Sequence, residues 1–287
     1  MGSVITGGRP LNKTLKEYAR GIAGGLLFSF PLLFTMEVWW AGFSATPVQL
    51  LILMLVTYLL LLGYNRYAGM RSGVSWKSVM IDSVEEMGIG FVLSFVVLWV
   101  LNQIEPVSMG ISSELMGKVI IEAMAVSIGV SIGTAQLGTH EALEDDEQNE
   151  DVEEEKTPGR IGMVVLAFCG AILIGGNVAP TEEVIVLAVG ATPGHILAMA
   201  LASLLLSIVV VYFSDFKGTD NKHLDDFWFW FVLDTSVSYL VALAASAFML
   251  WFFGRFEQVS FWVGFSQVIV LGVLSSLGAS AGRLLIR

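Results

Sequence analysis

The sequence predicts an all-α membrane protein in which eight transmembrane helices form two four-helix repeats of parallel topology. Three observations support this fold class. Hydrophobic residues make up 55% of the 287 residues and charged residues only 14%, against about 45–50% and 25% in soluble globular proteins. Eight apolar segments are long enough to cross a bilayer. Three motifs from the first half of the chain also recur in the second half.

Each expected span is an apolar segment of about 20 residues or more, the helical length that crosses a hydrocarbon core of roughly 30 Å. Lipid offers backbone amides no hydrogen-bond partner, so each segment must satisfy its amides internally, as a helix. In chain order the expected spans are Gly21–Phe43, Val48–Tyr67, Trp76–Leu101, Leu115–Gln136, Ile161–Gly190, Gly194–Phe213, Phe227–Phe253 and Phe261–Leu285.

Basic residues predict the direction of the spans. They precede the first span and follow the second, fourth, sixth and eighth, whereas the opposite loops contain Arg255 alone. The positive-inside rule therefore places both termini in the cytoplasm. The expected organisation is a cytoplasmic N-terminal segment (residues 1–20), a first four-helix repeat (21–138), an acidic cytoplasmic linker (139–160) and a second four-helix repeat (161–287).

The linker carries most of the net charge. Ten of the 26 acidic residues lie between Glu141 and Glu155, and the formal net charge of the chain is −11. A block of like charges is typical of a solvated segment. Because no basic face remains elsewhere, we expect no nucleic-acid partner.

The duplication rests on three recurring motifs. In the first motif, TMEV at 35–38 and ATP at 45–47 recur as TEEV at 181–184 and ATP at 191–193. In the second, Asp82, Glu105, Val107 and Ser108 recur as Asp234, Glu257, Val259 and Ser260. In the third, Ser-x-Gly-x-Ser-x-Gly at 127–133 recurs at 276–282. Four spans per half imply parallel repeats about an axis along the membrane normal, with the site at their junction. The serine and glycine stripes predict close helix packing, with a pore lining as the alternative.

Matching acids occur inside the expected spans. Glu37 pairs with Glu183, which has Glu182 beside it, and Asp82 pairs with Asp234. A charge at the centre of a spanning helix costs about 2.5–3.5 kcal/mol on insertion scales. We therefore expect the acids to form an outer and an inner level of carboxylates along a water-filled pathway through the membrane. The alternatives are helix-start caps for the two aspartates and contact with lipid headgroups for Glu37. Glu85, Glu86 and Glu122 are weaker candidates, because the duplication does not repeat them.

Helix-breaking residues flank the outer acids. They are Pro31 in the first span and Gly175, Gly176, Asn177 and Pro180 in the fifth. A broken helix frees carbonyl oxygens, which with Asn177 and carboxylates could bind a hard cation. Calcium is such a cation, so the expected metal ligands are Glu37, Glu183, Asp82 and Asp234, with no other cofactor. An ordinary proline kink is the alternative.

The segment Phe30-Pro31-Leu32-Leu33-Phe34-Thr35-Met36-Glu37-Val38-Trp39-Trp40 resembles a motif of an uncharacterised family of prokaryotic polytopic integral membrane proteins. The resemblance implies a multi-span fold in a prokaryotic inner membrane, and it brings no activity with it.

The residues favour a cation channel or cation/proton exchanger, with calcium as the expected ion and pH sensitivity through the embedded carboxylates. Two alternatives remain: a proton-coupled carrier of a small organic substrate, and a non-transporting scaffold or sensor. No phosphate-binding loop or catalytic set stands out, so we expect no enzyme. The expected partners are the lipid bilayer, an inorganic cation and protons; the oligomeric state stays open.

Overall fold

The computed structural model describes residues 11–68, 75–104, 112–136, 160–215 and 224–284. Within these ranges the regular structure is entirely α-helical. Residues 1–10 of the expected N-terminal segment and residues 137–159, which contain most of the expected acidic linker, lie outside the described part. The all-α prediction is thus confirmed for the part of the chain that is described.

The two halves of the chain contain the same succession of helices. In each half a first helix is followed by a short helix and then by three long ones. The first half has α1 (Leu11–Leu33), α2 (Met36–Ser44), α3 (Pro47–Tyr67), α4 (Trp76–Val100) and α5 (Ser113–Gln136). The second half has α7 (Arg160–Gly176), α8 (Glu183–Gly190), α9 (Pro193–Asp215), α10 (Leu224–Phe252) and α11 (Phe261–Leu284).

Six of the eight expected spans are single helices long and apolar enough to cross a membrane: α3, α4, α5, α9, α10 and α11. The other two were wrong as continuous helices. Gly21–Phe43 is divided between α1 and α2, which are bent by 82° at their break, and Ile161–Gly190 is divided between α7 and α8. α1 ends two residues after Pro31, and α7 ends at Gly176. Proline and paired glycines both weaken helical hydrogen bonding, which explains the two breaks.

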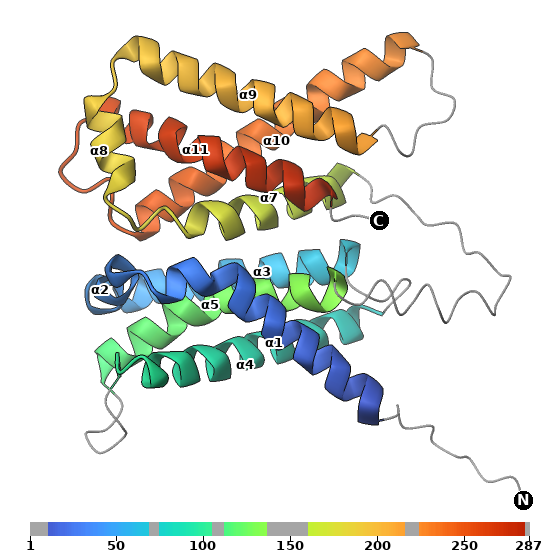
Figure 1. Ribbon diagram of the computed structural model, residues 1–287, viewed down its shortest axis with the longest axis vertical. Helices are drawn as coiled ribbons and strands as arrows, with labels where there is room; N and C mark the ends of the chain where they lie inside the picture. Colours follow the sequence, from blue (N-terminus) through green and yellow to red (C-terminus); the bar gives the residue numbers. More distant parts are fainter. Residues whose placement is uncertain (1–10, 69–74, 105–111, 137–159, 216–223, 285–287) are drawn as a thin grey trace, which may run out of the picture.

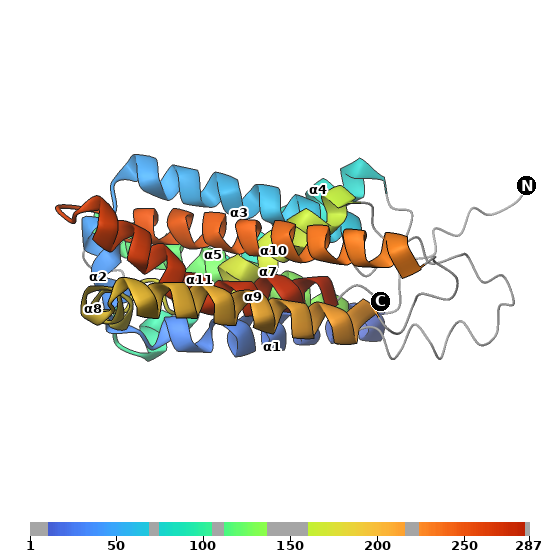
Figure 2. The ribbon, with the colours of Figure 1, turned by 90° about the horizontal axis from the view of Figure 1, so that it is seen from above.

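The long helices of the two halves run along a common direction and form two stacked bodies (Figure 1). α2 and α8 lie at the same end of the molecule in both views (Figures 1 and 2). The start of α1 and the end of α11 lie at the opposite end. The halves meet mainly where α7 packs against α3, with smaller contacts to α5 and α1.

The burial pattern is that of a protein with an apolar outer surface. The spanning window of α5 is 83% buried, whereas those of α3 and α9 are 28% and 17% buried. Exposed leucines follow one face of α3 and of α9, including Leu51, Leu55, Leu201 and Leu205. An apolar surface of this extent is unusual on a soluble monomer and suits contact with lipid.

Close glycine contacts join the first and last helices of each half. A Cβ atom on Gly24 of α1 would lie 2.8 Å from the carbonyl oxygen of Gly129 on α5. A Cβ atom on Gly170 of α7 would lie 2.9 Å from the carbonyl carbon of Gly278 on α11. Only glycine permits backbones to approach so closely. The predicted packing role of the glycine stripes is thereby confirmed.

Two hydrogen-bond patterns also recur in both halves. Nζ of Lys118 on α5 donates to the carbonyl oxygen of Gln103, and Nε2 of Gln267 on α11 donates to that of Arg255, each at 3.2 Å. The backbone N–H of Thr46 donates to the Gln49 side chain before α3. That of Thr192 donates to His195 before α9. Both halves thus use the same devices to start a helix and to hold a loop.

Candidate functional site

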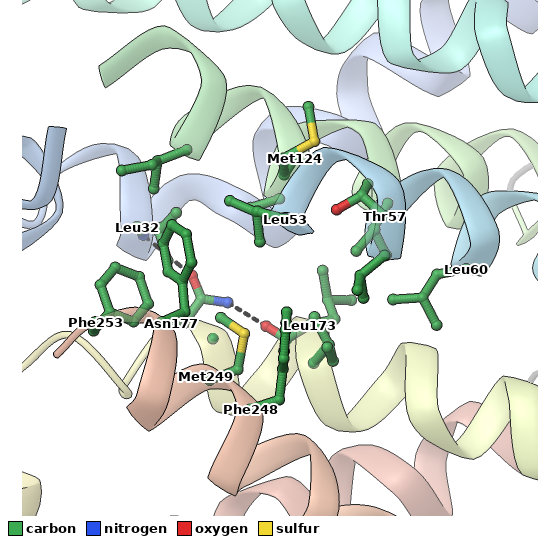
Figure 3. A pocket seen from close by; sticks show the side chains of 17 residues that line it. Leu32, Leu53, Thr57, Leu60, Met124, Leu173, Asn177, Phe248, Met249 and Phe253 are labelled. Atoms are coloured by element: carbon green, nitrogen blue, oxygen red, sulfur yellow. Dashed lines mark hydrogen bonds between the residues drawn. The ribbon is translucent and has the colours of Figure 1, made fainter. Parts of the chain in front are cut away.

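An apolar pocket lies at the junction of the two halves. Its lining comes from α1, α3 and α5 on one side and from α7, Asn177 and α10 with the residue after it on the other (Figure 3). Its cavity volume is about 30 Å³, and the empty space around it, open solvent included, is about 500 Å³. The polar side chains in the lining are Thr57 and Asn177. The pocket therefore suits an apolar group with a few hydrogen-bonding atoms better than a bare ion.

Asn177 occupies the gap that the two helix breaks create. It directly follows the last residue of α7, and its side-chain oxygen accepts a hydrogen bond from the backbone N–H of Leu32 at 3.1 Å. Its side-chain amide donates to the carbonyl oxygens of Phe28 at 3.2 Å and of Leu173 at 2.6 Å. Figure 3 shows Asn177 between Leu32 and Leu173.

Phe28 and Leu32 are four residues apart, the spacing of a helical hydrogen bond. The amide of Asn177 binds both the carbonyl group of Phe28 and the N–H group of Leu32, so a side chain from the second half is tied to the backbone of α1. In this arrangement both polar atoms of Asn177 bind backbone groups. The geometry therefore supports a bridging role for Asn177, and its predicted role as a cation ligand gains no support.

The outer acids lie at the beginnings of the two short helices. Glu37 is half-buried in the first turn of α2, while Glu183 is exposed as the first residue of α8 and Glu182 is exposed just before it. The first turn of a helix attracts carboxylates because its amides are unpaired and its dipole is positive. Both short helices thus begin with an acid for a local reason.

The pKa of Glu183 is lowered from its ordinary value. The largest cause is the hydrogen bond from its own backbone N–H, followed by the hydroxyl group of Thr181; the positive charge of Arg255 acts in the same direction. Arg255 is itself held at the α7–α8 break, where its guanidinium donates to the carbonyl oxygen of Pro180. Glu183 thus belongs to a small outer cluster around this break and does not line the pocket.

In the described structure, the inner acids (Asp82 and Asp234) do not form a shared site with the outer acids (Glu37, Glu182 and Glu183). Asp82 is half-buried in α4. Asp234 belongs to α10, and its side chain lies outside the described part. Within the described residues, no three Asp, Glu, His or Cys side chains gather as metal ligands would. Glu37, Asp82, Glu182 and Glu183 are absent from the lining of the junction pocket.

The described structure instead buries two other carboxyl groups. Glu86 of α4 accepts a hydrogen bond of 2.7 Å from the side-chain amide of Asn65 on α3. The same amide donates to Ser83 at 3.1 Å, and its oxygen accepts from Ser131 of α5 at 2.9 Å. This network joins α3, α4 and α5. Ser127 and Ser131 lie four residues apart on α5, which was the available sequence signal for a polar interior.

Glu122 of α5 is the second buried carboxyl group. It is 0% exposed, and neither of its oxygens has a hydrogen-bond partner in the described structure. Its position is readable from the sequence. It lies seven residues, or about two helical turns, before Gly129, so it shares the face that packs against α1. The sequence prediction favoured acids that recur in both halves and ranked Glu122 lower, because the corresponding residue of the second half is Leu271.

A family comparison establishes what kind of protein this is. Residues 17–286 match the model of the family described as "Putative integral membrane protein (DUF2391)". The chain belongs to this family. No curated protein and no solved structure matches the chain.

Membership of the DUF2391 family agrees with the six long apolar helices and the lipid-suited exterior. The family match confirms that the chain is an integral membrane protein, and the described helices confirm the all-α fold class. The description of the family assigns no ion, substrate or reaction.

Proposed function

We propose that this DUF2391 protein is a proton-coupled carrier of a small organic solute that has an apolar body and a polar head. The observation that carries the proposal is the apolar pocket between the halves, bounded by two broken helices and bridged by Asn177. Carriers built from repeats commonly bind their cargo at the repeat junction, beside discontinuous helices.

The recurring devices of the two halves support the transport mechanism. We propose that the chain arose by duplication and that α1 and α7 also cross the membrane, which gives eight spans with both termini in the cytoplasm of a prokaryotic cell. Two similar bodies around one pocket can rock against each other and expose the cargo to alternate sides. The bridge from Asn177 to Phe28 and Leu32 would then hold the halves together at one end of the pocket.

A cation/proton exchanger is the second candidate, with calcium as the ion. The observation that favours it is the recurrence of an acid in the first turn of α2 and of α8, at Glu37 and Glu183. These acids would form the outer level, and Asp82 and Asp234 the inner level. The apolar lining of the junction pocket places this candidate after the organic-solute carrier.

Binding to the purified protein in nanodiscs tests the choice. Three labelled probes share a phenyl body and differ in the head: phenylalanine, phenyltrimethylammonium and benzenesulfonate. We expect saturable binding of at least one probe that is lost in Thr57→Phe, which fills the pocket. The control Leu55→Phe lies on the same helix, where Leu55 is 58% exposed, and should bind normally.

Two results would count against the carrier. If none of the probes binds, the junction pocket is not a cargo site for such solutes. If labelled calcium binds instead, and Glu37→Gln or Glu183→Gln removes that binding, the exchanger is the better assignment.

A further inference from the structure

Glu122 differs from the other buried charged side chains of the first half in having no partner. Lys118 donates to Glu114 at 2.7 Å and to the carbonyl oxygen of Gln103, and Glu86 accepts from Asn65. Both carboxyl oxygens of Glu122 lack a hydrogen-bond partner in the described structure, although the side chain is 0% exposed. An ionised carboxylate in such surroundings is far more costly than a neutral carboxyl group.

The contacts of neighbouring residues place Glu122 on the seam between α1 and α5. Cβ atoms on Gly21, Gly24 and Gly25 would meet residues progressively earlier on α5, so the two helices are antiparallel. A Cβ atom on Gly25 would lie 3.1 Å from a side-chain carbon of Val126. One turn further along, the same register sets Ser29 opposite Glu122. Ser29 is also buried, and its hydroxyl donates to Gly25.

The second half shows that the fold does not need a carboxyl group at this position. In the recurring Ser-x-Gly-x-Ser-x-Gly register, Glu122 of α5 corresponds to Leu271 of α11. Leu271 is also 0% exposed, and α11 packs on α7 through the same kind of glycine contact. An apolar side chain therefore satisfies the position sterically, and the carboxyl group of Glu122 calls for a reason other than packing.

We propose that Glu122 is the proton-binding residue of the carrier, an inference that rests on the proposed transport function. With the α1–α5 seam closed, the carboxyl group holds one proton on an oxygen. When α1 moves relative to α5 during the transport cycle and water enters the seam, that O–H bond breaks and the proton passes to water on one side of the membrane. A proton from water on the other side then re-forms the O–H bond, so each cycle moves one proton and leaves Glu122 unchanged.

Of the two buried carboxyl groups in the described structure, Glu122 is the one without a hydrogen-bond partner. On α4, Glu86 is engaged by Asn65, and Glu85 accepts from Tyr18 of α1. On α5, Lys118 is engaged by Glu114. The helices packed against α5 carry further titratable groups. They are Lys13, Lys16, Glu17 and Arg20 on α1, Glu37 on α2, Tyr58, Tyr64, Arg66 and Tyr67 on α3, Lys77 and Asp82 on α4, and Arg160 and Cys169 on α7. The thiol of Cys169 donates to the carbonyl oxygen of Leu60.

Infrared spectroscopy of the protein in lipid tests proton binding without any cargo. We expect the carbonyl stretch of a protonated carboxyl group that shifts slowly in D₂O and disappears in Glu122→Leu, a variant that copies Leu271. Glu86→Gln, measured in parallel, identifies the band of the other buried carboxyl group. If Glu122→Leu removes no protonated-carboxyl band, Glu122 is ionised and the proposal is overturned.

Transport into proteoliposomes tests coupling. For whichever of phenylalanine, phenyltrimethylammonium and benzenesulfonate binds, we expect Glu122→Gln and Glu122→Leu to keep exchange of labelled for unlabelled probe. Accumulation driven by a proton gradient should fall to the level seen without a gradient. Glu182→Gln, at an exposed residue before α8, should keep both activities.

The outcomes separate the two proposals. Gradient-driven accumulation that persists in Glu122→Leu overturns the role of Glu122 while the carrier stands. Absence of probe exchange in the unmodified protein overturns the carrier, and the infrared band and its D₂O shift then still decide whether Glu122 binds an exchangeable proton.

Discussion

The two halves of the molecule share one frame, the close packing of the first helix against the last, and differ in the polar side chains that they bury. Both use glycine contacts to bring the first helix against the last, at Gly24 and at Gly170. The first half buries Glu86, Lys118 and Glu122, whereas the buried polar side chains described in the second half are uncharged. The frame therefore does not depend on buried charge. Glu122, the buried carboxyl group without a partner, is better explained by function than by folding.

The largest loss of stability is expected from substitutions that disturb the glycine contacts of the shared frame in either half. Gly24→Ala and Gly170→Ala each add a Cβ atom within 3 Å of backbone atoms of the partner helix. Each should lower the free energy of unfolding by about 2–3 kcal/mol, because overpacking displaces backbone. Unfolding in mixed micelles of increasing SDS content measures this. Gly88→Ala is the control, since a Cβ atom there meets nothing within 4 Å. Equal stability of Gly24→Ala and Gly88→Ala would contradict the shared frame.

The next largest effect is expected from removing the hydrogen bonds that join the two halves at their junction. Asn177→Ala removes the amide that binds Phe28 and Leu32 of α1. We expect a loss of about 1–3 kcal/mol, the usual cost of leaving buried polar groups unpaired, together with faster deuterium exchange at the Leu32 amide. Thr57→Ala, which removes the other polar side chain of the pocket, should leave that amide protected. Unchanged exchange at Leu32 in Asn177→Ala would show that the bridge does not join the halves.

Exchanging Glu122 and Leu271 between the two halves tests how much stability the buried carboxyl group costs. Glu122→Leu should raise the free energy of unfolding by about 1–2 kcal/mol, because it removes an unpaired buried polar group. Leu271→Glu, the reverse change in α11, should lower it by at least as much. The same SDS titration compares both variants. A stability loss in Glu122→Leu would mean that the carboxyl group has a structural partner.

The smallest effect concerns the outer ends of the halves. The pKa of Glu183 is lowered in the folded protein by its own N–H group, Thr181 and Arg255. A lowered pKa contributes stability above the unfolded value of about 4.3, and this contribution is lost as the pH falls through the folded value. The stability difference between the unmodified protein and Glu183→Gln should therefore shrink on acidification. A difference that grows as the pH falls would reverse the assigned sign.

Local sequence properties predicted much of the fold. Span length and hydropathy found six helices as single elements, because both are properties of a continuous segment. Pro31 and the run from Gly175 to Pro180 showed where the other two segments were weak. The sharp bend of α1 against α2 was not predicted, because a proline permits a bend while tertiary packing decides its angle.

The candidate site was harder to predict, because its residues act across the junction. Glu37 and Glu183 recur in the sequence, yet the first turn of a helix favours an acid for local reasons. Asn177 bonds to α1, some 145 residues away in the chain, and no spacing rule predicts such a partner. Glu122 was visible as an acid on the glycine face of α5, and was set aside because its counterpart is Leu271.

The most direct test of the central claim is exchange of labelled for unlabelled phenyl probe across proteoliposomes that contain the unmodified protein, Thr57→Phe or Leu55→Phe. We expect saturable exchange of at least one probe in the unmodified protein and in Leu55→Phe, and none in Thr57→Phe. Equal exchange in all three proteins, or exchange in none of them, would contradict a cargo site between the halves.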